Sequence, residues 1–215
     1  MSNDIDSLIE QLARDAAPVK RLHPPMLRAG LCIVAILSGM AVAILLFANL
    51  AVIEARADAG FLPIELVGTL GTGILATIAA FHLSLPDRSP RWALLPLPAL
   101  AVWLAGSGLG CVRHFLSGAG NDWSMRSSWH CVLFICGVGL PLMVAMLLVL
   151  WRARPLAPAP VAIAGGLAAA AFAAFLLEFF HPFDISVMDL TLHAAAVGAV
   201  VWVSGVTGNR LLAKT

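Results

Sequence analysis

The chain has 215 residues, of which 60% are hydrophobic and only 12% are charged, and its mean hydropathy is +0.94. A soluble globular domain is seldom so apolar, so the composition indicates a membrane protein. The formal net charge of +1 gives no electrostatic support to a nucleic-acid partner. We therefore expect contact with membrane lipid and no direct contact with nucleic acid.

Residues 1–28 form a polar leader, and the first half of this leader predicts a short amphipathic helix. Its apolar residues recur at helical spacing, at Ile5, Leu8, Ile9 and Leu12. A helix of about 14 residues is marginal alone in water, so this stripe needs a surface to cover. Acidic residues border the stripe, whereas a helix that lies on lipid normally carries Lys and Arg. A groove on a partner protein is therefore the favoured surface, and a tail packed loosely on the rest of the chain is the alternative.

Six apolar stretches follow the leader, each long enough to cross a bilayer, which takes about 20 residues. We expect them at about residues 29–50, 62–83, 92–112, 129–150, 159–179 and 187–207. The predicted fold is an all-α integral membrane protein in which residues 29–215 form a compact six-helix bundle with short loops. Clusters of glycine in the second, third and sixth stretches favour close helix packing in lipid.

The basic residues predict how the bundle is oriented. Ten of the 13 Lys and Arg residues lie on the side of the expected spans that holds the two termini, namely Arg14, Lys20, Arg21, Arg28, Arg88, Arg91, Arg152, Arg154, Arg210 and Lys214. Cytoplasmic loops retain positive charge, so both termini are predicted to be cytoplasmic.

Residues that can bind metals or react with oxidants gather at the opposite, outer ends of the expected spans. They are Cys111, His114, His130, Cys131, Glu178, His181, Asp184, Asp189 and His193. Thiolates and imidazoles suit zinc, copper or cadmium, with carboxylates as further ligands. Alternatively, Cys111 and Cys131 would form a disulfide if their Cα atoms approach within about 7 Å. The plainer interpretation is that the cysteines are packing residues and the histidines are interfacial. We expect no resident cofactor, and at most a transient zinc or heavy-metal ion as a signal.

Five short strings, taken in order, resemble the NrsF family of six-span bacterial anti-sigma factors. They are LIEQLARDAAPVKRL before the first span, LPDRSPRW between the second and third, GLGC and WHC around the third loop, and HPFD before the last span. The resemblance implies that the chain holds an extracytoplasmic-function sigma factor at the bacterial inner membrane. It also implies release of that factor under oxidative or heavy-metal stress, and it makes the leader stripe the sigma-binding helix.

The same resemblance assigns roles at the outer end. It places a sensing cysteine in an exposed WxC position, which is Cys131 here. Many relatives carry a second cysteine beside the histidine of the last loop, but this chain has Pro182 after His181. Cys111 or His181 would then take the place of that second thiol. The expected sensing set is Cys131, Cys111, His130 and His181, and the expected metal ligands are Cys131, His130, His181 and Asp184.

Two enzymatic alternatives stay open beside the expected non-enzymatic regulator. Cys111 and Cys131 would serve a thiol oxidoreductase, although the chain has no CxxC motif. Ser107 and His193 would serve a rhomboid-like intramembrane protease, but the GxSG pattern is missing around Ser107.

Overall fold

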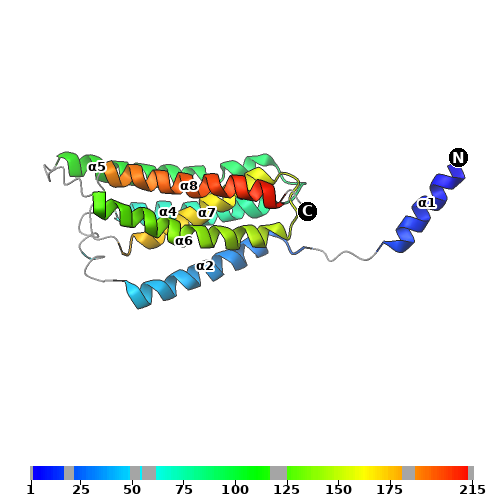
Figure 1. The fold of residues 1–215 in the computed structure, drawn as a ribbon, viewed down its shortest axis with the longest axis horizontal. Helices are drawn as coiled ribbons and strands as arrows, with labels where there is room; N and C mark the ends of the chain where they lie inside the picture. Colours follow the sequence, from blue (N-terminus) through cyan, green and yellow to red (C-terminus); the bar gives the residue numbers. More distant parts are fainter. Residues whose placement is uncertain are drawn as a thin grey trace.

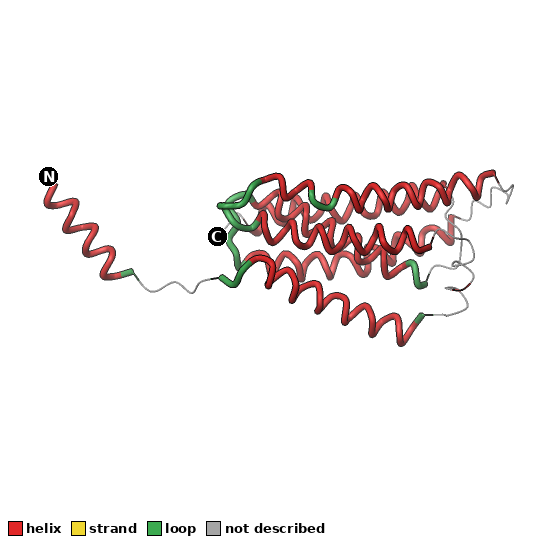
Figure 2. The backbone as a smooth tube through the Cα atoms, turned by 180° about the vertical axis from the view of Figure 1, so that it is seen from behind, coloured by secondary structure: helices red, strands yellow, loops and turns green. Residues whose placement is uncertain are grey.

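The computed structural model describes residues 2–16, 22–48, 54, 62–116, 125–180 and 187–212. Within these residues the secondary structure is helical (Figures 1 and 2). The elements are α1 (Ser2–Asp15), α2 (Pro25–Phe47), α4 (Leu62–Leu83), the 3₁₀ helix η1 (Pro90–Leu94), α5 (Leu97–Leu116), α6 (Met125–Trp151), α7 (Pro158–Leu177) and α8 (Val187–Leu212). All of these helices except α1 and η1 belong to one bundle (Figure 1).

The six bundle helices are long and apolar enough to cross a membrane, which confirms the predicted six-span fold. The first span begins at Pro25 rather than near residue 29, because Pro25 occupies the first helical turn, where its missing N–H costs nothing. The third span is preceded by η1, where the Ser89 side chain accepts a hydrogen bond from the Arg91 backbone N–H at 3.3 Å. Continuous α-helix therefore starts at Leu97 instead of residue 92.

Helix α7 lies at the centre of the bundle and packs against α4, α6 and α8. Alanine is its commonest residue, and 14 of its 20 residues are buried. The outer helices also pack against one another: α5 packs on α4, α8 packs on α6, and α2 packs on α4. On α2 only Ala29 and Met40 are fully buried, so this helix is the most loosely held of the six.

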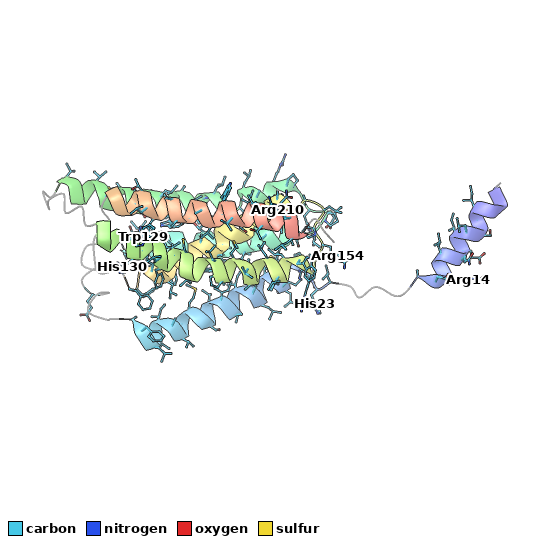
Figure 3. The ribbon with its side chains drawn as sticks, viewed as in Figure 1. Arg14, His23, Trp129, His130, Arg154 and Arg210 are labelled. Atoms are coloured by element: carbon cyan, nitrogen blue, oxygen red, sulfur yellow. The ribbon has the colours of Figure 1, made fainter. Side chains whose placement is uncertain are left out.

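We call the end of the bundle at which α2 begins and α8 ends the terminal end, and the other the distal end. Figure 3 shows His23, Arg154 and Arg210 at the terminal end, and Trp129 and His130 at the distal end.

The 3₁₀ helix is fixed at the terminal end by an aromatic stack. The rings of Trp92 and the buried His82 lie 3.9 Å apart at an angle of 20°, and His82 Nδ1 is 3.0 Å from the Ile78 carbonyl oxygen.

Close helix contacts occur at glycines, as the sequence predicts. A Cβ atom on Gly68 of α4 would lie 2.6 Å from the backbone of Trp103 on α5, and one on Gly166 of α7 would lie 2.5 Å from Ser204 Cβ on α8. At the second contact the Ser204 hydroxyl donates a hydrogen bond of 2.6 Å to the Ala162 carbonyl of α7. These contacts give the bundle its packing energy, since lipid supplies no hydrophobic force between helices.

Substitution of Gly68 tests the α4–α5 contact. We expect Gly68→Ala to destabilise the bundle by about 1 to 3 kcal/mol, because the new methyl group meets backbone atoms that cannot rotate away. The matched control is Gly108→Ala on α5, where a Cβ meets nothing within 4 Å. The measurement is the thermal unfolding midpoint in mild detergent; equal midpoints for the two variants would contradict close packing of α4 on α5 at this glycine.

Candidate functional site

The leader helix α1 presents its apolar stripe to solvent. Ile5, Leu8, Ile9 and Leu12 are between 55% and 64% exposed. Figure 1 shows α1 apart from the bundle, and the helix ends at Asp15. The amphipathic leader helix predicted from the sequence is thus confirmed, and in this structure its stripe does not lie on the bundle.

The polar face of α1 is acidic. Its basic residue, Arg14, pairs with Glu10 through Nη2 and Oε1 at 3.0 Å, and both side chains are largely exposed. Such an exposed pair contributes only about 0.3 to 0.5 kcal/mol to the helix. Asp6 and Asp15 are exposed as well. The helix therefore offers a partner an apolar ridge with carboxylates beside it.

At the distal end, the structure separates the three residues of the WHC string. Trp129 and His130 are exposed and are seen at the distal end in Figure 3. Cys131 is only 3% exposed. The expectation that Cys131 occupies an exposed position is therefore wrong. The cause is that α6 begins at Met125, which places Cys131 well inside the helix and on its inward face.

The side chain of Cys131 belongs to a small apolar cluster between three helices. Its buried partners are Ile135 of α6, Ala173 and Leu177 of α7, and Ala196 of α8. A change of size or charge at this sulfur would therefore disturb the packing of α6 on α7 and α8, because close-packed interiors respond even to one added heavy atom.

Cys111 lies on a different helix, α5, and is 9% exposed. It follows Gly110, where a Cβ would come 3.9 Å from Glu65 Oε1. None of the four cysteines, all of which lie in the described parts of the chain, is in a disulfide. Whether Cys111 and Cys131 pair under oxidation stays a prediction.

The proposed metal ligands are only partly described. His181 and Asp184 lie outside the described residues, and so does the loop that holds them. In the part of the chain that the structure does describe, His, Cys, Asp and Glu form no group of three or more that could hold a metal ion. The metal set therefore stays a prediction, with His130 and Cys131 as its described members.

One buried acid was not singled out from the sequence. Glu65, in the first turn of α4, is 2% exposed and packs against α5, where a Cβ on Gly106 would lie 3.4 Å from its Cγ. A carboxyl group inside an apolar span was the available signal, because ionisable residues are costly there. The glycines of α5 explain how the group is accommodated, since they leave room for its side chain.

The chain matches the family described as "Negative regulator of sigma F", NrsF, over residues 12–213. The match covers all six spans and begins at the last residue of the leader stripe, Leu12. No curated protein and no solved structure matches the chain.

Proposed function

Because the chain belongs to the NrsF family, we propose that it is an anti-sigma factor that holds an extracytoplasmic-function sigma factor at the bacterial inner membrane through α1. The family makes the chain a negative regulator with a sigma factor as its partner, and the six spans make it a multi-pass membrane protein. The proposal adds the class of sigma factor, the docking helix, the membrane and the signal that ends the inhibition.

The exposed stripe of α1 is the observation that carries the proposal. Slightly more than two turns of helix with apolar side chains at i, i+3, i+4 and i+7 are the usual form of a helix that docks in a groove. The carboxylates beside the stripe complement the basic surfaces that sigma factors present to promoter DNA, and such complementarity favours binding of the correct partner. Occupying those surfaces would keep the sigma factor from transcription.

The proposed orientation puts the terminal end of the bundle in the cytoplasm and the distal end in the periplasm. The support is the excess of Lys and Arg at the terminal end, where Arg88, Arg91, Arg152, Arg154 and Arg210 lie in the described loops and helix ends. This orientation would put α1 on the side of a cytoplasmic partner and the distal cysteines near the periplasmic surface.

We also propose that the signal acts at Cys131, helped by Cys111, His130 and His181. In a metal response, a soft cation such as cadmium or zinc displaces the thiol proton and binds the thiolate. In an oxidative response, a peroxide converts the thiol to a sulfenic acid and leaves as water; a second thiol, from Cys111, then displaces another water and forms the disulfide. Either event puts new volume or charge into the buried cluster around Cys131.

Catalysis is the weaker alternative. The NrsF match is to a regulator family. Ser107, the nucleophile that a protease would need, is 5% exposed inside the bundle. A regulator needs only a binding helix and a means of releasing its partner, for which we propose α1 and Cys131.

The docking proposal predicts the effect of charge on the stripe. Leu8→Asp should weaken sigma binding by at least about 30-fold, because truncating a buried interface anchor costs about 2 kcal/mol and 1.4 kcal/mol is a factor of ten. Ser7→Asp adds the same charge to the opposite face of α1 and should leave binding within about twofold. The assay is recovery of the sigma factor with the full-length detergent-purified protein; equal loss in both variants would reject the stripe as the docking surface.

The orientation and the burial of Cys131 together predict a labelling pattern in intact cells. A membrane-impermeant maleimide should label His130→Cys in a background without other cysteines, because position 130 is exposed at the distal end. A chain that keeps only Cys131 should react at least about tenfold more slowly, because Cys131 is only 3% exposed and the bulky maleimide is excluded from its packed cluster. Labelling of the two at the same rate would contradict the buried position, and absence of label at position 130 would contradict the orientation.

The trigger proposal predicts a selective loss of response. Cys131→Ser should leave sigma sequestration intact in unstressed cells and abolish release by cadmium or peroxide, measured with a sigma-dependent reporter. Cys136→Ser is the control, since Cys136 is a half-buried cysteine of the same helix and should leave release unchanged. Normal release in Cys131→Ser would show that the signal acts elsewhere.

A further inference from the structure

A large groove runs along the bundle between α2 and α6, and nothing proposed above uses it. Its volume is about 1220 Å³, which exceeds the roughly 300 to 1,000 Å³ of ordinary small-molecule pockets. The walls are apolar side chains, with Leu31, Ile36 and Ala43 on α2 and Val138, Leu142 and Val149 on α6 among them. Leu31 is 63% exposed, so the groove opens to the surface that faces the bilayer.

The polar groups of the groove are at its terminal end. His23, Arg28 and Arg152 line it there, and the described residues that line the groove include no acidic side chain. The Arg28 guanidinium carbon lies 5.1 Å from the centre of the buried Phe81 ring, which holds this cation in place through a cation–π contact. Nη1 of Arg28 is buried and has no hydrogen-bond partner among the described residues.

We propose that this groove is a binding site for an anionic phospholipid. Its phosphate would bind Arg28 and Arg152, and its acyl chains would lie along α2 and α6. The charge is complementary, because guanidinium groups bind phosphate oxygens through paired hydrogen bonds.

The length of the groove fits an acyl chain. Arg28 and Ala43 mark its ends on α2 and are 15 residues apart, or about 22 Å along a helix axis. One leaflet contributes about 15 Å of hydrocarbon to a bilayer. The apolar wall is therefore long enough to cover a chain that extends from a headgroup at Arg28 to the middle of the membrane.

The shape argues against a transmembrane helix of another protein as the occupant. The two walls touch within the groove, where the Cys32 thiol donates to Met146 Sδ at 3.4 Å. A helix with its side chains is about 10 Å wide and cannot enter at that depth, whereas flexible acyl chains fill irregular space. A partner helix would also have to bring a costly buried carboxylate to the level of Arg28.

In the experiment, the purified full-length protein in neutral detergent is mixed with equal amounts of phosphatidylglycerol and phosphatidylcholine that have identical acyl chains. The bound lipids are then counted by native mass spectrometry. We expect the wild type to prefer phosphatidylglycerol by well over fivefold, and Arg28→Gln and Arg152→Gln each to lower that preference by about fivefold. Arg210→Gln removes a charge from the same end of the bundle but not from the groove, and should leave the preference unchanged.

A second variant tests the apolar part and guards against misfolding of Arg28→Gln. A Cβ on Gly39 would meet nothing within 4 Å, so Gly39→Trp fills the groove without disturbing a helix contact and should reduce bound phosphatidylglycerol. Equal binding of the two lipids by the wild type would overturn the proposal, and so would an Arg210→Gln variant as impaired as Arg152→Gln. Co-purification of a membrane protein that Gly39→Trp displaces, with no lipid preference, would assign the groove to a partner helix and likewise overturn it.

Discussion

The bundle depends on the close approach of its helix backbones to α7. In lipid, helices associate through van der Waals packing and a few interhelical hydrogen bonds, so side chains must be small wherever two backbones meet. Helix α7 meets this constraint because it is rich in alanine and has two glycines. The absence of a side chain at Gly166 lets α8 approach closely enough for the Ser204 hydroxyl to donate a hydrogen bond to the Ala162 carbonyl. Helices α4, α6 and α8 pack directly on α7, whereas α2 and α5 pack mainly on α4.

Both functional features follow from that arrangement. The cysteine proposed as the trigger packs directly on Ala173 and Leu177 of α7. A change at its sulfur would therefore act on the central helix of the bundle. The groove lies between α6 and α2, the helix that buries only Ala29 and Met40 in the bundle. Helix α2 is also the span that follows the leader, so the helix with the fewest buried residues is the one joined to the proposed partner-binding helix α1.

The sequence predicts the number and type of the helices well, because a run of about 20 apolar residues has few other stable forms in a membrane. The leader stripe is equally clear, since its spacing puts the apolar residues on one face only in a helix. Exposure was predicted wrongly for Cys131, because α6 is apolar on every side and its sequence does not show which face meets α7 and α8. Which residues of different helices are in contact could not be predicted from the sequence. Arg28 and Arg152, counted along the chain, only mark orientation, and their shared position at one end of the groove follows from the packing of α2 beside α6.

The packing also indicates a route by which a change at Cys131 would reach the leader. Phe134 and Val138 of α6 pack against the Cys131 cluster and also against a second cluster that contains Met40 of α2. Release needs a coupling free energy of only about 1 to 3 kcal/mol, which corresponds to a 5- to 150-fold change in affinity. Displacing α7 would break the central contacts of the bundle, whereas shifting α2 disturbs little beyond Ala29 and Met40. Among the six spans α2 has the fewest buried residues, and it is the span that leads directly to α1.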